Sequence, residues 1–154
     1  MFRTPKTLFR TLAFAEAVSW TLLITGLILR ATLDWSLAVS IGGGIHGFVF
    51  LSYGATAILV AKNQRWRAGP TVIAIVSAVV PYATIPVEIW LARSGRLKGL
   101  WRIEPSDDPR DGAWHDRLMR FMLRRPWVLV ALIVLAVIAV FVALLIIGPP
   151  GGRE

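Results

Sequence analysis

The sequence contains no cysteine and only two histidines, and its nine acidic residues stand against seventeen basic ones. The lack of cysteine excludes disulfides, cysteine-ligated zinc, iron–sulfur clusters and thiol catalysis. One intramembrane histidine, His46, without a His-x-x-x-His pair is too little for a haem or metal site. We therefore expect no cofactor and no bound metal.

Groups for catalysis are also missing. No Ser/His/Asp set occurs, and no two carboxylates are spaced in a way that suggests hydrolysis. The glycine run in 41–47 superficially resembles a phosphate loop, but no Lys-Ser/Thr pair follows it and the surrounding residues are apolar. We expect the chain not to be an enzyme. A membrane enzyme that acts on lipid is an alternative, but the sequence lacks the catalytic groups that such an enzyme needs.

Apolar residues are in excess. They make up 56% of the 154 residues, with a mean hydropathy of +0.65, whereas soluble domains contain roughly 45–50%. They fall into four blocks of about 20 residues, the length that crosses ~30 Å of hydrocarbon. The pattern predicts an all-α fold, an integral membrane bundle of four hydrophobic helices over 11–29, 37–61, 69–92 and 127–147.

The ends of these blocks suggest three regions. A membrane domain is expected over 1–98, a basic linker with a short amphipathic helix over 99–125, and the last transmembrane helix with its tail over 126–154. Pro126 suits the first position of that helix, and the Gly-Pro-Pro-Gly run at 148–151 would end it. The first helix resembles a signal peptide but lacks a small-residue cleavage site, so we expect it to be retained.

The net charge of +8 is interpreted as a membrane signal, not as nucleic-acid binding, because the basic residues lie between apolar blocks. With four crossings the basic residues divide seven against ten between the two sides. If 69–92 enters and returns, with breaks at Pro81 and Pro86, they divide fifteen against two. We favour four crossings and leave the orientation open.

Each of the first three helices carries one polar or small-residue face, and polar groups inside a membrane are the first candidates for function. Helical spacing predicts one layer of Glu16, Tyr53 and Ser77 and another of Thr25, His46, Tyr82 and Thr84, with Glu88 beyond the second. The expected intramembrane polar network is Glu16, Ser19, His46, Tyr53, Ser77, Tyr82, Thr84 and Glu88. These groups either hold the helices in register or form a proton or solute path.

Two further surfaces follow from residue spacing. Gly42, Gly43 and Gly47 predict a close helix contact, with Gly43 and Gly47 as a small-xxx-small pair. In the long loop an amphipathic helix is expected either to lie in the membrane surface, against anionic lipids, or to pack on the protein's own helices. Its lipid or partner surface comprises Trp114, Arg117, Arg120, Phe121, Arg124 and Arg125.

Motifs in the polar stripes resemble the YdzA-like family of small bacterial membrane proteins, a family of unknown function. They are the segment 8–20 around Glu16, then His46-Gly47 with Tyr53, and then Ser77, Pro81, Thr84 and Glu88 at spacings of four, three and four. The resemblance covers about residues 5–98. It implies a three-helix unit in the bacterial cytoplasmic membrane and no particular activity.

These features favour a non-enzymatic accessory subunit of a larger bacterial membrane complex, with respiratory and lipid-export assemblies as candidate hosts. The expected partners are the lipid bilayer and other membrane subunits. The alternative is a small homo-oligomeric transporter or proton-conducting protein that uses Glu16, His46 and Glu88.

Overall fold

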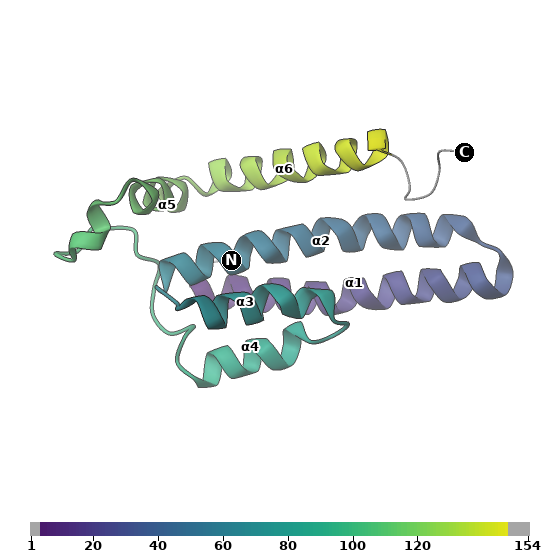
Figure 1. The fold of residues 1–154 in the computed structure, drawn as a ribbon, viewed down its shortest axis with the longest axis horizontal. Coiled ribbons are helices and arrows are strands. Elements are labelled where there is room, and N and C mark those ends of the chain that lie inside the picture. The colour runs from purple at the N-terminus through teal and green to yellow at the C-terminus, as the bar shows by residue number, and fades with distance from the viewer. Residues whose placement is uncertain (1–3, 148–154) are drawn as a thin grey trace. The chain divides into compact units, whose positions relative to one another are not determined.

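The computed structural model of the chain describes residues 4–147, and within that range it contains helices and no strands. It separates into two compact units that divide between Arg102 and Ile103. The first unit holds α1 to α4 and the second holds α5 and α6 (Figure 1). The predicted all-α class is confirmed, whereas the helix stop predicted at 148–151 lies outside the described residues.

A long antiparallel pair, α1 (Pro5–Leu33) and α2 (Ser36–Asn63), forms the frame of the first unit (Figure 1). The side chain of Thr4 caps α1 by accepting from the N–H of Thr7 at 3.1 Å. Asp34, with φ 54°, ends α1 and turns the chain into α2. Among the described helices these two are long and apolar enough, by length and composition, to cross a membrane.

The third apolar block corrects the prediction of one continuous helix over 69–92. It consists of α3 (Ala68–Val76), the 3-10 turn η1 (Ser77–Val79) and α4 (Thr84–Arg93). Pro81 disfavours helical backbone in the residue before it, and Val80 is extended with φ −103° and ψ 123°. Tyr82 then adopts φ 64°, and the chain reverses.

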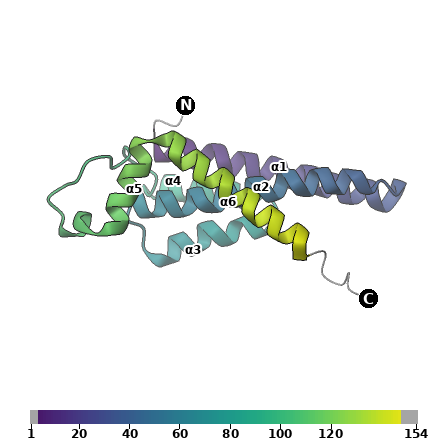
Figure 2. The same ribbon diagram turned by 90° about the horizontal axis from the view of Figure 1, so that it is seen from above.

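This α3–α4 hairpin returns to the end of the α1–α2 pair where it began. The indole of Trp66, just before α3, donates to the carbonyl of Arg96, just after α4, at 2.8 Å. At the other end of the hairpin, the carbonyl of Ala78 accepts from the indole of Trp20 at 3.2 Å. Trp20 lies near the middle of α1, so the hairpin reaches about halfway along the pair (Figure 2). The predicted count of four crossing helices is therefore not confirmed.

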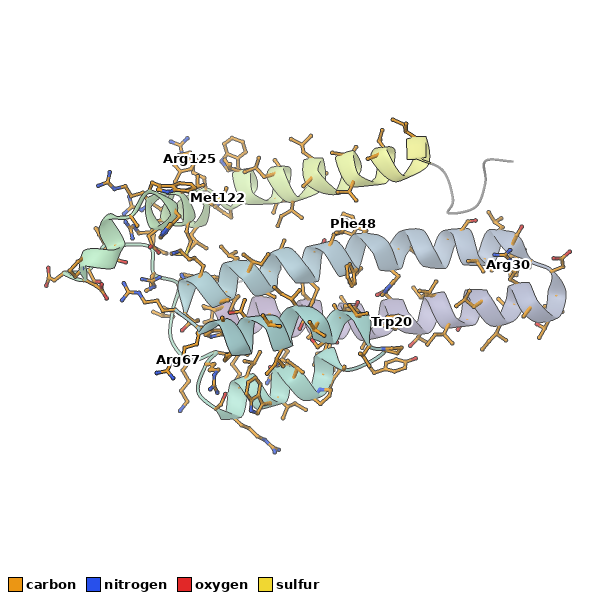
Figure 3. All side chains as sticks on the ribbon, viewed as in Figure 1. Trp20, Arg30, Phe48, Arg67, Met122 and Arg125 are labelled. Atoms are coloured by element: carbon orange, nitrogen blue, oxygen red, sulfur yellow. The ribbon has the colours of Figure 1, made fainter. Side chains whose placement is uncertain are left out.

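The core of the first unit lies where the hairpin packs against α1 and α2. Its buried members are Phe9, Ala13, Tyr53, Ala57, Val60, Ala74, Ala78, Leu91 and Leu97. Beyond the hairpin, α1 and α2 have mainly each other as neighbours, and Ile28, Leu33, Leu37 and Ile41 are exposed. Figure 3 shows Arg30 and Arg67 at opposite ends of the helix pair, with Trp20 between them.

The second unit contains a 3-10 turn, η2 (Pro109–Gly112), followed by α5 (Trp114–Arg124) and α6 (Pro126–Ile147). As predicted, Pro126 occupies the first position of α6, where its missing N–H costs no hydrogen bond. The axis of α6 is bent by 101° from that of α5. If this bent pair is counted as one span, the described residues contain up to three membrane-span candidates.

Candidate functional site

Polar side chains of α1, α2 and the α3–α4 hairpin meet between the helices of the first unit. The structure joins the eight residues of the predicted network in smaller groups than the two layers expected. His46 lies beside Glu16 and Ser19, and Tyr53 beside Ser77. Tyr82, Thr84 and Glu88 each contact α1 instead of His46.

The side chain of Glu16, with its carboxylate, is fully buried between the helices. His46 Nδ1 lies 3.8 Å from its Oε1 atom, and the His46 ring stacks on Trp20 with centroids 4.4 Å apart. Neither carboxylate oxygen has a hydrogen-bond partner among the described residues. A charged carboxylate without donors is costly in such a place, so Glu16 needs either a proton or an imidazolium beside it.

Ser19 fixes the tautomer of His46. Its hydroxyl donates its single proton to the backbone carbonyl of Glu16 at 2.8 Å. The same oxygen lies 3.0 Å from His46 Nδ1, and with its proton already used it can only accept there. Nδ1 therefore carries hydrogen, and Nε2 is the ring atom open to a further proton. The pair can hold one proton as a neutral acid beside a neutral imidazole, or as carboxylate beside imidazolium.

Glu88 lies at the opposite end of the network from the place predicted for it. Its carboxylate is buried and pairs with the Arg10 guanidinium through Nε at 2.9 Å. The prediction assumed a crossing helix, and the return of α4 brings Glu88 back to the start of α1. Arg10 was missed as a site residue because its charge served only as a topology signal. No spacing in the sequence pairs Arg10 with Glu88, because only the return of α4 brings these two residues together.

Tyr53 and Ser77 form a hydrogen-bonded link between α2 and the hairpin, as the predicted first layer requires of these two residues. The Ser77 hydroxyl donates to the carbonyl of Ala74, so the Tyr53 hydroxyl donates to Ser77 at 3.1 Å. Tyr82 instead reaches Thr21 at 3.3 Å, and the predicted layer of Thr25, His46, Tyr82 and Thr84 does not form. The network therefore consists of separate contacts between helices, each made by a different pair of residues, and not of continuous layers.

Comparison with known proteins assigns the chain to a family. The family profile DUF3817, described as a domain of unknown function, matches residues 6–93. The chain belongs to this family. The matched DUF3817 region contains α1, α2, the hairpin and all eight residues of the predicted network. The finer family name suggested by the sequence motifs, YdzA-like, is not the name of the matching profile and stays a prediction.

A curated relative of this DUF3817 protein comes from Streptomyces coelicolor and bears the name "putative membrane protein". The two are 39% identical over 103 residues, which is 66% of this chain and 12% of the relative. The match thus spans about an eighth of the relative's length. No solved structure matches the chain. The chain is a membrane protein with transmembrane helices, in a family whose activity is unknown.

Within the DUF3817 region, Gly26 of α1 and Gly42 of α2 each lie close to the backbone of the facing helix. A Cβ atom on either would lie 2.7 Å from a backbone oxygen, that of Ala38 or of Leu22 respectively. The predicted contact at Gly42 is therefore present. Gly43 would meet only a side chain at 3.9 Å, and a Cβ at Gly47 would meet nothing within 4 Å. The prediction that Gly43 and Gly47 form a close contact with another helix is therefore wrong for the described helices.

The predicted lipid or partner surface on α5 lies outside the DUF3817 match. Trp114, Phe121, Arg117, Arg124 and Arg125 are exposed, as expected of such a surface. Arg120 does not belong to this surface as predicted, because it is buried and donates to the carbonyl of Asp111 at 2.6 Å. Its Nη1 atom also lies 3.5 Å from the Asp111 carboxylate, so Arg120 holds α5 against the preceding loop.

Proposed function

We propose that this DUF3817 protein is a non-enzymatic accessory subunit of a larger complex in the bacterial cytoplasmic membrane. The observation that carries the proposal is the tip of the α3–α4 hairpin, residues 79–83. Val79, Val80 and Tyr82 are exposed there, at the depth of the middle of α1. Irregular backbone at membrane depth is tolerated only where protein or water covers it.

Protein is the better cover for this tip. A water-filled cavity needs polar groups to hold its water. Exposed side chains near the middle of α1 and α2, among them Leu22, Ile45 and Phe48, are apolar. Of these, Phe48 is labelled in Figure 3. A helix of another subunit would satisfy both the apolar side chains and the need to keep lipid away from the turn. Respiratory and lipid-export assemblies remain the candidate hosts.

The hairpin also supports one orientation in the membrane. With α1 and α2 crossing, the hairpin returning and α6 crossing, fifteen basic residues lie on one side and two on the other. The positive-inside rule then places the start of α1, the base of the hairpin and residues 94–125 in the cytoplasm. This arrangement resolves the near balance of the four-crossing topology.

A cross-linking experiment tests the accessory role. Because the chain has no cysteine, Val80→Cys can carry a single photoactivatable maleimide in the native membrane. We expect one larger product that contains a different membrane polypeptide, which also co-purifies stoichiometrically in mild detergent. Val72→Cys, on an exposed α3 position nearer the hairpin base, is the matched control and should yield less of it. Products of the chain's own mass or twice that mass, with no co-purifying partner, would contradict the proposal.

A second candidate function is a small homo-oligomeric transporter or proton-conducting protein. The buried pair of Glu16 and His46, with its unpartnered carboxylate oxygens, favours it. Glu88 is less suited to that role than predicted, because Arg10 already pairs with it. The expected result is a proton flux in dye-loaded proteoliposomes that Glu16→Gln and His46→Ala abolish and Ser52→Ala retains. Equal flux in all of these, or none, would eliminate this candidate.

A further inference from the structure

The second unit presents an apolar stripe that nothing in that unit covers. Trp114, Leu118 and Phe121 of α5 are 75%, 44% and 47% exposed, and they lie at i, i+4 and i+7, on one side of the helix. The opposite side is occupied, because Asp116, Met119 and Arg120 are buried. The helix therefore has an inner face that holds it to its loop and an outer face of large apolar side chains.

The inner face fixes the helix to its loop. The carboxylate of Asp111 accepts from both the N–H and the hydroxyl of Ser106, at 2.8 and 2.7 Å. Arg120 donates to the carbonyl of the same aspartate. This buried connection uses one arginine of α5 internally and prevents the stripe from turning inward without breaking it.

The remaining basic residues are placed beside the stripe. Arg117 and Arg124 lie at i and i+7, on one flank of the stripe at 100° per residue, and Arg125 follows the helix. All three are exposed, and the Arg125 guanidinium lies over the Phe121 ring at 5.2 Å. Long basic side chains next to exposed aromatic residues suit a membrane surface, where the stems of the basic side chains lie in the apolar zone and their charges reach phosphates.

The direction of α6 supplies an independent observation. Its apolar 22-residue helix starts two residues after α5 ends, and its axis is bent 101° from that of α5. If α6 runs along the membrane normal, α5 lies nearly in the membrane plane. An in-plane helix at the start of a span lies at the depth of the lipid head groups.

We propose that α5 is an interfacial anchor that binds anionic phospholipids of the bilayer surface, with Trp114, Leu118 and Phe121 immersed and Arg117, Arg124 and Arg125 on the head groups. The anchor does not depend on membership of a complex. It fits the orientation argued above, because anionic lipids of the cytoplasmic leaflet attract basic segments next to a span.

Depth measurement on the full chain in lipid nanodiscs tests the anchor. Single cysteines at Leu118 and Phe121 carry spin labels, and Glu104→Cys, exposed in the preceding loop, is the aqueous control. Collision with oxygen against a water-soluble nickel complex reports immersion. In discs with anionic lipid we expect the labels at 118 and 121 to favour oxygen and the label at 104 to favour nickel. In purely zwitterionic discs the first two should become shallower.

The charge dependence separates the anchor from other occupants. Adding Arg117→Gln, Arg124→Gln and Arg125→Gln to Leu118→Cys should remove the difference between anionic and zwitterionic discs. The proposal is overturned if position 118 is as exposed to nickel as position 104. It is also overturned if immersion ignores lipid charge and the arginine substitutions, or if neither collider reaches position 118, which would indicate protein packing.

Discussion

At the scale of single residues, close packing between α1 and α2 depends on two glycines that leave no room for a side chain. Sequence spacing drew attention to Gly42, whereas the residue that it faces, Leu22, and the second close contact, Gly26 against Ala38, follow from the register of the two helices. Gly47, in the same run of small residues, faces open space within the described structure. A small-residue pattern thus identifies candidate helices, and register decides which glycine is in the contact.

Substitutions at Gly42 and Gly47, both in α2, should therefore differ in outcome. Gly42→Val should destabilise the protein by about 1–3 kcal/mol, because its Cβ would lie against the Leu22 carbonyl, a backbone atom that cannot move aside cheaply. Gly47→Val should change stability by less than about 0.5 kcal/mol. Unfolding midpoints in detergent mixtures measure both. Equal losses would show that the α1–α2 register is different.

Arg10 and Glu88 give an asymmetric prediction. Removing the cation in Arg10→Ala leaves a buried carboxylate, and we expect a loss of about 2 kcal/mol, below the cost for a fully buried pair because Arg10 is 48% exposed. Glu88→Gln leaves an arginine that can reach water, and should cost less. In the double variant, Glu88→Gln should recover part of the Arg10→Ala loss. Strictly additive losses in the double-mutant cycle would contradict a direct pair.

At the scale of elements, the sequence alone is sufficient to predict the helices whose determinants are local. The apolar lengths of α1, α2 and α6 and the proline at the start of α6 are visible in the chain itself. The sequence alone leaves the reversal at 80–82 as one of two alternatives, because Pro81 can either kink a helix or end it. Which occurs depends on packing, here on Trp66, Trp20 and Thr84 contacts with distant segments.

The hydrogen bond from Tyr53 to Ser77 should fasten the hairpin to α2. Both side chains are buried, and Tyr53→Phe should cost about 0.5–1.5 kcal/mol by removing the donor. Tyr82→Phe is the matched control, because Tyr82 is 45% exposed and its contact with Thr21 is longer. Amide exchange in 68–79 should accelerate in the first variant and not in the second. Similar exchange in both would show that the hydroxyl of Tyr53 does not hold the hairpin.

At the scale of the whole molecule, the central claim is that residues 68–93 enter the membrane and return to the same side. This return brings Glu88 to Arg10. In a membrane that α1 and α2 cross, it would also expose a turn at mid-membrane depth and gather the basic residues on one face of the bilayer. The accessory role and the orientation both depend on it. The eight polar residues were identifiable from the sequence, but their pairing was not, since pairing is set by this return.

Cysteine accessibility in intact cells tests the return most directly, because the natural chain contributes no background labelling. Single cysteines are placed at Gln64, before the hairpin, at Leu100, after it, and at Leu33, at the far end of α1. With a membrane-impermeant maleimide we expect labelling at 33 only, and labelling at 64 and 100 only after the cells are opened. Labelling of positions 33 and 100 from one side, with position 64 on the other, would show that the segment crosses and would contradict the account.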